Sequence, residues 1–548
     1  MYKEKWNKTR LRILTIGGFS EVGQNCLAIE YGNDILIVDL GIGFPDYLYP
    51  GADKLLPNIS YLQHNKRKIR GILITHGHAD HIGGLKYLSR ALGYPKIYGS
   101  SFTIEMIKEK ILDSKSKSKI KLQIVPPGKK LIFPSFTARF ITVTHSIPDA
   151  RSLVIGTPKG HIFISGDFKF DDKPLNTPKT DYVGLAKVGS VRPILGIYDS
   201  TNSFSKGWSV SETEVQEVLY KLISRINGRV LVSTFSSEIT RIHSLLEIAR
   251  RLKRKVAILG RSIAVSVDVA VKTGYIKNER KVLINSSDIK KYKPREVMLI
   301  VTGTQGEENA TLAKLAEDRY KSFRLNKADT VIMSSSVIPG NDLVISHLLC
   351  ALVNKGVNVI HKKQFDVHTT GHAHQEEQLK MIKLTNPQYI MPGYADSIMK
   401  DQLRKTIVKD GFANSNILMT RNGYVWEFVN NNWILKNNNK IYPYKVEGNR
   451  ILKRNENLYE NRRRQLNNGL VVITKDRNNK FTINPINISS QRVEKVIIEE
   501  IKKTLATNIQ TINKNNKMGI DDLIKSKTRY TVRKVSGKNP EVRIIKVN

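Results

Sequence analysis

Hydrophobic and polar positions follow strand patterns through the first 170 residues. Gly71–Thr75 and Ile162–Ser165 are apolar runs rich in β-branched residues, and Phe136–Val143 alternates between apolar and polar positions. A fourth run, "DILIV", ends immediately before Asp39. Short apolar runs of this composition predict buried strands, and alternation predicts a strand with one covered face. The pattern therefore predicts four strands that each end near a histidine or an aspartate.

Beyond residue 208 the pattern alternates between strands and helices. The runs "GRVLVSTF" and "ADTVIMSSS" predict strands, and "SEITRIHSLLEIARRL" predicts a helix between them. This alternation is typical of an α/β domain with a parallel sheet. A stretch rich in charge and Asn, "VEGNRILKRNENLYENRRRQLNNG", then predicts a linker. It leads to a terminal domain in which the strands "LVVITKD" and "VRIIKVN" flank a helix over Val493–Leu505.

The loop after Gly71–Thr75 places three histidines and an aspartate within six residues, "HGHADH". His76 and His78 alternate, so on extended backbone both point to the same side. Asp80 and His81 follow where the chain bends toward the helical stretch "IGGLKYLSRAL". Two neutral imidazoles can bind one metal ion while the next carboxylate and imidazole turn toward a second. The alternative is a solvated, histidine-rich loop without a function.

Three more residues of the ligand type follow predicted strands. His145 ends the alternating strand, Asp167 follows "HIFISG", and Asp39 follows "DILIV". Each residue alone is weak evidence, because a His or Asp after a strand is commonly a turn or cap residue. Four strand ends of this kind together predict a metal site with two ions.

The order His-x-His-x-Asp-His, with Asp39, His145 and Asp167 around it, resembles the metallo-β-lactamase superfamily. The resemblance implies a four-layer αβ/βα sandwich with a two-zinc site between its sheets. His76, His78 and His145 would hold one zinc, Asp80 and His81 the other, and Asp167 would bridge them. Asp39 would orient the ligand loop without binding metal. Two Zn²⁺ ions per chain are expected, with Mn²⁺ or Mg²⁺ as alternatives.

Longer motifs follow Asp167 in a fixed order, among them "YDSTNSFSKGWSVSE", "VTGTQGEENATLAKLA" and "VHTTGHAHQEEQLKMIKLTNP". They resemble the β-CASP insertion, and "HSIPDA", "GDFKFD" and "IPGN" resemble the bacterial ribonuclease J family, over about residues 12–394. The implied fold is α/β: a metallo-β-lactamase domain with an inserted β-CASP domain and a small C-terminal α+β domain. The expected boundaries are 1–208 and 369–447 for the metallo-β-lactamase domain, 209–368 for the β-CASP domain, 448–465 for the linker and 466–548 for the terminal domain.

The resemblance implies a 5′→3′ exoribonuclease that acts on single-stranded RNA with a 5′-monophosphate and can cut internally, in mRNA decay and rRNA maturation. His372 and Asp199 would be catalytic, and Asp80 would be both ligand and catalytic carboxylate. A pocket of hydroxyls and backbone N–H groups would bind the terminal phosphate. The matching positions are Ser237, Arg261, Ser262, His368, Thr370 and Gly371. For the serines, ordinary turn hydroxyls are the alternative.

The sequence departs from the family pattern at two places. Glu238 and Thr240 stand where the family has Asn and His. In "YIMPGYADSIMK", Tyr394 stands where the family has a histidine that binds the second zinc. His374, in "TTGHAH", is an alternative ligand that the spacing does not establish. A weakly active or inactive paralogue that partners an active subunit therefore remains the alternative function. A hydrolase of small esters would leave the β-CASP motifs without a role.

Charge favours a polyanionic partner. The chain has 89 Lys and Arg against 49 Asp and Glu, a net charge of +40. Such an excess attracts RNA and raises encounter rates, although AT-rich coding also supplies lysines. From residue 450 onward there are 23 Lys and Arg against 9 Asp and Glu. In the family such a terminal domain supports self-association, so we expect a homodimer or homotetramer, or a hetero-oligomer with a second subunit of this type.

The number of cysteines and the hydropathy of the chain indicate the cellular compartment in which the protein is expected. Cys26 and Cys350 lie in apolar stretches and match no zinc spacing, so we expect two reduced core thiols. The N-terminus "MYKEKWNKTR" has no apolar segment of a signal peptide, and no stretch approaches 18 uninterrupted apolar residues. We therefore expect a cytoplasmic protein without a membrane span.

Overall fold

The computed structural model describes residues 10–113, 117–321, 323–338, 340–448, 450–452, 456–476, 481–512 and 520–546. The chain divides into two compact units. The larger unit comprises Met1–Gly43 and Leu56–Pro443, and the smaller unit comprises Phe44–Leu55 and Tyr444–Asn548. Among the described helices, none is long and apolar enough to cross a membrane.

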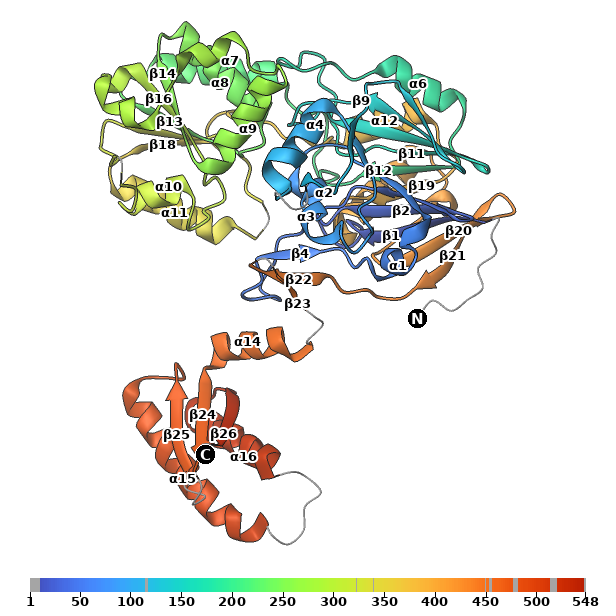
Figure 1. Ribbon diagram of the computed structural model, residues 1–548. Coiled ribbons are helices and arrows are strands. Elements are labelled where there is room, and N and C mark those ends of the chain that lie inside the picture. Colours follow the sequence, from blue (N-terminus) through green and yellow to red (C-terminus); the bar gives the residue numbers. More distant parts are fainter. Residues whose placement is uncertain are drawn as a thin grey trace. The chain divides into compact units, whose positions relative to one another are not determined.

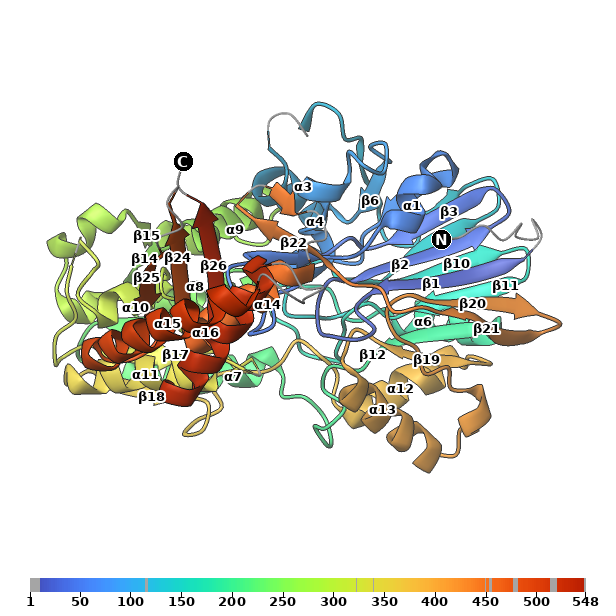
Figure 2. The ribbon, with the colours of Figure 1, turned by 90° about the horizontal axis from the view of Figure 1, so that it is seen from below.

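Two sheets of the larger unit face one another (Figures 1 and 2). The first sheet has the order β21-β20-β1-β2-β3-β5-β6-β7 and the second has the order β19-β12-β11-β10-β9-β8. The strands of the first are β21 (Asn432–Asn438), β20 (Tyr424–Val429), β1 (Leu11–Gly17), β2 (Cys26–Tyr31), β3 (Asp34–Val38), β5 (Ile69–Leu73), β6 (Ile97–Gly99) and β7 (Leu122–Ile124). Those of the second are β19 (Ile390–Gly393), β12 (Leu195–Asp199), β11 (Gly160–Ile164), β10 (Arg151–Thr157), β9 (Thr137–Thr142) and β8 (Lys130–Ile132).

Apolar side chains from the inner faces of both sheets form one buried core, which includes Leu36 and Leu73 of the first sheet and Leu153 of the second. A second cluster covers the outer face of the second sheet with α6 (Tyr182–Ser190), α12 (Gln375–Thr385) and α13 (Ser397–Lys409). The short helices on the side of the first sheet are α1 (Ser60–His64), α2 (Ala79–Ile82), α3 (Leu85–Leu88) and α4 (Ser101–Met106). The predicted αβ/βα sandwich is confirmed.

The stretch "IGGLKYLSRAL", predicted as one helix, forms instead the end of α2 and the separate helix α3. Gly83 and Gly84 lie between them. A Cβ atom at Gly84 would lie 2.7 Å from the carbonyl oxygen of Gly41, so the backbone packs here more closely than a side chain allows. The Gly84 N–H donates to the carbonyl oxygen of Leu40 at 2.9 Å instead of to a partner within the helix, which interrupts the helix after the histidine loop.

The inserted part of the larger unit has its own parallel sheet, with the order β15-β14-β16-β13-β17-β18. Its helices lie on both sides of this sheet (Figure 1). The strands are β15 (Leu283–Ile284), β14 (Lys255–Leu259), β16 (Val297–Val301), β13 (Val230–Ser233), β17 (Thr330–Met333) and β18 (Asn358–His361). The helices are α7 (Glu212–Ser224), α8 (Ile239–Arg251), α9 (Arg261–Lys272), α10 (Thr311–Ala316) and α11 (Asp342–Asn354). This is the predicted α/β insertion.

The smaller unit contains two three-stranded sheets, β23-β22-β4 and β25-β24-β26. The first comprises β4 (Lys54–Leu56), β22 (Tyr444–Glu447) and β23 (Arg450–Leu452), so residues near 54 join the C-terminal part instead of the predicted first domain. The second comprises β24 (Leu470–Lys475), β25 (Phe481–Ile486) and β26 (Glu541–Lys546), with α15 (Gln491–Ile512) and α16 (Ile520–Ser536) packed on it. Strand β25 and helix α16 were not predicted.

The predicted linker, 448–465, contains most of helix α14 (Glu456–Asn468). Glu460 and Arg464 form an i,i+4 ion pair along it, and Arg462 pairs with Glu447. Pairs at this spacing favour a helix even in a polar sequence. The linker was predicted from the polar composition of this segment, and the spacing of its charges, which indicates a helix, was not considered.

The two cysteines differ from expectation in one respect. Cys26 is buried and Cys350 is exposed on α11, and both are free thiols. The expectation that both lie in the core is wrong for Cys350, because it stands on the solvent face of an otherwise apolar helix.

Candidate metal centre and active site

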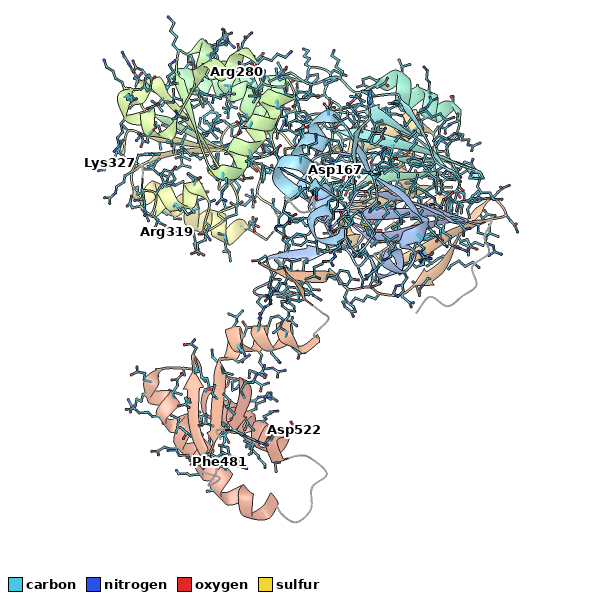
Figure 3. All side chains as sticks on the ribbon, viewed as in Figure 1. Asp167, Arg280, Arg319, Lys327, Phe481 and Asp522 are labelled. Atoms are coloured by element: carbon cyan, nitrogen blue, oxygen red, sulfur yellow. The ribbon has the colours of Figure 1, made fainter. Side chains whose placement is uncertain are left out.

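The predicted ligand residues meet at one edge of the two sheets. Strand β5 leads into the loop of His76–His81, the segment after β9 carries His145, and the segment after β11 carries Asp167. Figure 3 shows Asp167 in the interior of the larger unit, whereas Arg319 and Lys327 lie at the outer rim of the inserted part. Rigid strands thus present each ligand residue from a short loop, which is the arrangement that a precise site requires.

Four residues form the first ligand group, namely His76, His78, His145 and Asp167. The Nδ1 atom of His78 lies 3.0 Å from Nε2 of His76 and 3.1 Å from Nε2 of His145. Asp167 Oδ2 lies 3.6 Å from the first of these Nε2 atoms and 3.8 Å from the second. Four donor atoms therefore surround one small volume.

The donor set of this group fits a divalent metal. Zinc bonds of about 2.0–2.2 Å in a tetrahedron place neighbouring ligand atoms roughly 3.3–3.6 Å apart, close to the separations found here. Burial lowers the pKa of His78 to about 3 and that of His76 and His145 well below the usual value, so the imidazoles are neutral and have lone pairs to give. The second oxygen of Asp167 is buried without a hydrogen-bond partner. A buried carboxylate oxygen of this kind takes an ion or a water molecule as its partner.

A second group contains Asp80, His81 and Asp167. His81 Nε2 lies 3.4 Å from Asp80 Oδ2 and 3.3 Å from Asp167 Oδ2, so Asp167 belongs to both groups. Burial alone would lower the pKa of His81, but the carboxylates of Asp167, Asp80 and Asp39 outweigh it and raise the pKa. A cation is thus favoured at this place, either a proton or a metal ion.

Asp39 lies beside the ligand loop and forms hydrogen bonds with it. Its Oδ2 accepts a hydrogen bond from Nδ1 of His81 at 2.8 Å, which directs Nε2 toward the ligand group. The same carboxylate accepts from the backbone N–H and the hydroxyl of Thr75. Asn25, at the start of the adjoining strand, places its Nδ2 near Asp80 Oδ2 and His81 Nε2. Thr75 and Asn25 were not predicted, since neither residue type is a usual zinc ligand.

Tyr394 lies at the predicted ligand position, directly after β19, with a positive φ of 59°. Its ring stacks on His81, with centroids 5.9 Å apart and planes 17° from parallel. Burial, followed by the carboxylates of Asp39, Asp167 and Asp199, raises the pKa of this phenol well above 10. The phenol is therefore neutral, and the second group has three members where the first has four.

His374 does not replace the missing ligand. It precedes α12, where its backbone N–H donates to Glu377 at 2.8 Å, and it belongs to none of the three ligand groups found in the described residues. The alternative raised by the sequence thus has no support in the geometry.

His372 and Asp199 form a third group with Asp167 at the edge of the metal centre. Nδ1 of His372 donates to Asp199 Oδ2 at 2.7 Å. Burial would lower the pKa of His372, but Asp199 and Asp167 outweigh it and raise the pKa to about 9. Asp199 is held in turn by the N–H and hydroxyl of Thr201. Asp199 thus favours the protonated form of this imidazole, whose Nδ1 lies 4.0 Å from Asp167 Oδ2.

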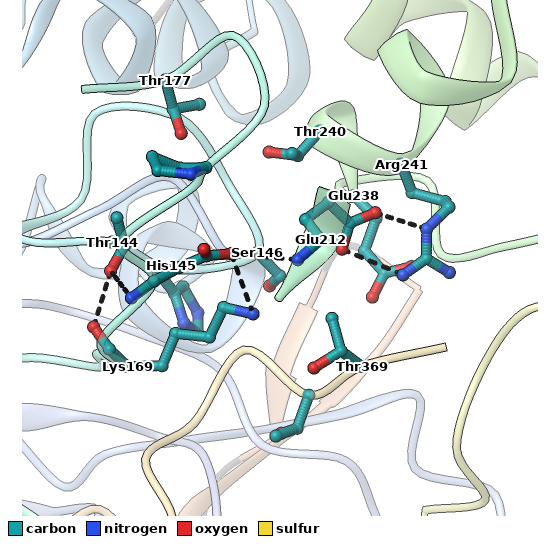
Figure 4. A pocket seen from close by; sticks show the side chains of 13 residues that line it. Thr144, His145, Ser146, Lys169, Thr177, Glu212, Glu238, Thr240, Arg241 and Thr369 are labelled. Carbon is teal, nitrogen blue, oxygen red and sulfur yellow. Dashed lines mark hydrogen bonds and ion pairs between the residues drawn. The ribbon is translucent and has the colours of Figure 1, made fainter. Parts of the chain in front are cut away.

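A small pocket adjoins this centre (Figure 4). His145 and Ser146 form one side, Lys169 another, and Glu238 and Arg241 at the start of α8 a third. The remaining lining residues are Thr144, Asp171, Pro174, Thr177, Glu212, Thr240, Thr369 and Thr370.

Of the six residues predicted to bind a terminal phosphate, Thr370 lines this pocket. Ser237, His368 and Gly371 each lie next to a lining residue in the chain, whereas Arg261 and Ser262 are exposed at the beginning of α9. Lys169, Glu212 and Arg241 line the pocket but were not predicted. They reach it from three separate segments, a proximity that spacing in the sequence does not reveal.

Gly371 forms a hydrogen bond with the metal-ligand residue His145, in addition to the role at an anion site that was expected of it. Its carbonyl oxygen accepts a hydrogen bond from Nδ1 of His145 at 2.6 Å, which turns Nε2 toward the ligand group. A Cβ atom at this position would lie 2.7 Å from both His145 Cε1 and Ser146 Oγ. The segment after the inserted domain therefore orients a metal ligand from the first part of the chain.

Two family descriptions match the chain. The "Metallo-beta-lactamase superfamily" matches residues 20–260, and "Ribonuclease J, beta-CASP domain" matches residues 227–352. Together with the ligand groups, these matches place the protein in the class of metal-dependent hydrolases with a β-CASP insertion.

Named relatives narrow the class. The chain is 32% identical to "Ribonuclease J 1" of Streptococcus pyogenes over 93% of this chain and 92% of that protein. It is 33% identical to "Ribonuclease J2" of Bacillus subtilis over 78% of this chain and 77% of that protein, and 34% identical to "Ribonuclease J" of Mycoplasma pneumoniae over 77% and 74%. The chain belongs to the ribonuclease J family.

A solved structure shares the fold. A protein of unknown function from Enterococcus faecalis superposes with a TM-score of 0.54 over 78% of this chain and all of that chain, at 15% sequence identity. At this identity the similarity shows the fold alone.

Proposed function

We propose that the protein is a zinc-dependent ribonuclease that removes nucleotides from the 5′ end of 5′-monophosphate RNA and also cuts internally. Its family makes it a metal-dependent nuclease of the hydrolase class. The observation that carries the finer proposal is the convergence of four donor atoms from His76, His78, His145 and Asp167, with His372 at the edge of this group.

The residues of the two ligand groups would hold two divalent ions, and Asp167 belongs to both groups. When bound, such ions activate water at neutral pH and polarise a phosphoryl group. Asp39 and Gly371 hold His81 and His145 in the tautomers that expose Nε2. Ligand positions are thus set before substrate arrives, which is the condition for a precise site.

His372 supplies a proton at the edge of the site. Its Nδ1 is held by Asp199, so the free Nε2–H can donate to an RNA oxygen. By donating this hydrogen bond, His372 stabilises the negative charge that develops on the phosphoryl group, or it protonates the leaving oxygen. Asp199 is then a positioning residue, because it touches His372 and not the substrate. Asp80 serves as a ligand and as a carboxylate that orients the attacking water.

Tyr394 supports a second candidate, a weakly active paralogue that works with an active subunit. The second ligand group lacks a fourth member, and the neutral phenol is a poor donor. We propose weak occupancy of the second site, with Mn²⁺ or Mg²⁺ as alternatives to Zn²⁺. We propose further that the chain assembles as a homodimer, a homotetramer or a hetero-oligomer with a second ribonuclease J chain. Its proposed location is the cytoplasm, and its proposed roles are mRNA decay and rRNA maturation.

The test compares RNA ends. Purified full-length chain receives two RNAs of one sequence, with a 5′-monophosphate or a 5′-triphosphate. Faster release of mononucleotides from the monophosphate is expected, because a triphosphate brings two further charged groups to a pocket suited to one. Equal rates with internal cuts alone would remove the exonuclease from the proposal. Co-purification with a second chain and no activity alone would favour the paralogue.

A further inference from the structure

Glu238 occupies an unusual place for a carboxyl group. It precedes α8 and is 6% exposed, and it lines the pocket beside the metal centre. Its Oε2 accepts a hydrogen bond from the Thr234 hydroxyl at 2.6 Å, and its Oε1 lies 3.6 Å from Nδ1 of His368. Figure 4 shows it on the wall beside Arg241, opposite His145 and Lys169.

The cations of the pocket are already paired. Arg241 binds Glu212 through two hydrogen bonds of 2.5 and 3.0 Å, and Lys169 lies 3.6 Å from Asp171. Within the part of the chain that the structure describes, Glu238 is the pocket carboxyl without a cation in direct contact. The pocket thus has a formal charge of −1 when Glu238 is ionised and zero when it is protonated.

The groups that face Glu238 come from several elements. Arg241 lies on its own helix, Glu212 at the start of α7, and Lys169 after β11. Lys362 and His368 approach from the segment after β18. Burial raises the pKa of Glu238 to about 7, and Arg241 and Thr234 oppose this shift without cancelling it. Burial also keeps the pKa of His368 well below its usual value, so this imidazole does not neutralise the carboxylate.

One hydroxyl of the pocket wall has no partner within the described residues. The Thr240 hydroxyl is buried without a hydrogen-bond partner, and so is Nδ1 of His368, which is not a lining residue but adjoins Glu238. Thr240 is 7% exposed and lines the pocket, together with Thr369 and Thr370. Since His145 belongs both to the pocket wall and to the first ligand group, a group bound here lies beside the reacting centre.

We propose that Glu238 selects RNA 5′ ends by charge: the pocket admits a terminal phosphate while this carboxyl is protonated and rejects it once the carboxyl is ionised. The proposal rests on the nuclease activity proposed above. A protonated carboxyl can donate a hydrogen bond to a phosphate oxygen, whereas a carboxylate repels it in a buried site of low dielectric. Preference for 5′-phosphate ends is therefore present below about pH 7 and is lost as the pH rises through that value.

The test measures kcat/KM on 5′-monophosphate and 5′-hydroxyl RNAs of one sequence between pH 6 and 8.5. The ratio of the two values cancels the pH dependence of the shared metal centre. For the natural sequence we expect this ratio to fall about tenfold or more over the range, because a group with a pKa near 7 changes from mostly protonated to nearly all ionised. Glu238→Gln keeps the shape without the charge, so its ratio should follow only the titration of the phosphate itself, whose second pKa is about 6.

Glu247→Gln is the matched control, because Glu247 lies on the same helix and pairs with Arg250 away from the pocket. It should reproduce the natural profile. A natural profile equal to that of Glu238→Gln would overturn the proposal, and equal thermal unfolding of the variants excludes a folding defect.

A binding measurement distinguishes failure of the proposal on Glu238 from failure of the proposed nuclease activity. Binding of the same two RNAs, labelled at the 3′ end, is followed by fluorescence anisotropy in EDTA, where cleavage does not occur. The ratio of dissociation constants should show the same pH dependence and the same effect of Glu238→Gln. If the RNAs bind with this pattern but are not cut when zinc is present, the nuclease proposal fails alone; if the binding ratio is flat with pH, the proposal on Glu238 fails.

Discussion

At the scale of single residues, the proposed zinc binding depends on the neutral imidazoles of the first ligand group. His76 is completely buried, and its pKa is well below the usual value. His76→Ala removes one of four donor atoms, so we expect loss of the tightly bound zinc and loss of nuclease activity by at least about 100-fold. Metal analysis of the purified variant and an RNA cleavage assay measure both effects.

His64→Ala is the control for this change, because His64 is exposed on α1, outside the ligand groups, and its Nδ1 bonds to the Ser60 carbonyl. It should keep metal and activity. Full zinc content in His76→Ala would contradict the assigned ligand set.

The second prediction for a single residue concerns Tyr394 and the metal content of the second ligand group. Tyr394→His would place an imidazole beside His81, where the neutral phenol now stacks. We expect a gain in metal per chain and an increase in rate of about 10-fold, since losses in such sites cost about 10–100-fold. Metal content and rate are measured with and without added Zn²⁺ or Mn²⁺.

The same exchange at Tyr389, whose hydroxyl bonds to Asn432 at the far end of β19, should change neither quantity. Two tight metals in the natural sequence, with no gain from Tyr394→His, would refute this explanation of the substitution.

At the scale of elements, the loop before α12 fixes His145. Gly371→Ala would place a Cβ atom 2.7 Å from the imidazole and from Ser146 Oγ, so the ligand must move. We expect zinc affinity to fall about 10-fold or more while the fold persists. Competition with a chromophoric chelator gives the affinity.

Gly77→Ala is an instructive comparison. Gly77 lies between two ligands, yet its added Cβ would meet Met106 and Ile147 at 3.4 Å, an ordinary contact. We expect it to change zinc affinity much less than Gly371→Ala does. The reverse order of the two effects would show that the carbonyl of Gly371 does not position His145.

Interactions between residues that are close in the sequence could be predicted, and interactions between distant residues could not. The loop His76–His81 was predictable because strand period, spacing and donor chemistry all lie within a few residues. The contact of Gly371 with His145 joins residues 226 apart, and its signal, a glycine, has many other uses. Thr75 and Asn25 were missed because ordinary hydrogen-bonding residues show their role only when the chain is folded. Glu238 was noticed as a departure from the family, but its burial and its lack of a cation required the structure.

At the scale of the whole molecule, the net charge of +40 predicts strong salt dependence of RNA binding. Each phosphate contact on a single strand contributes roughly −0.7 to the slope of log K against log salt. We expect a slope of about −2 or steeper for a short single-stranded RNA, measured by anisotropy in EDTA between 50 and 300 mM KCl. A slope near zero would mean that the basic residues reflect composition and not an RNA surface.

We propose that the ligand groups support a metal-dependent ribonuclease that acts from the 5′ end. The most direct measurement follows 5′-monophosphate RNA, labelled at its 3′ end, with purified full-length protein before chelation, in EDTA, and after return of Zn²⁺. We expect stepwise loss of nucleotides from the 5′ end, no cleavage in EDTA, and recovery with zinc. Degradation that persists in EDTA, or no cleavage by zinc-loaded protein, would contradict it.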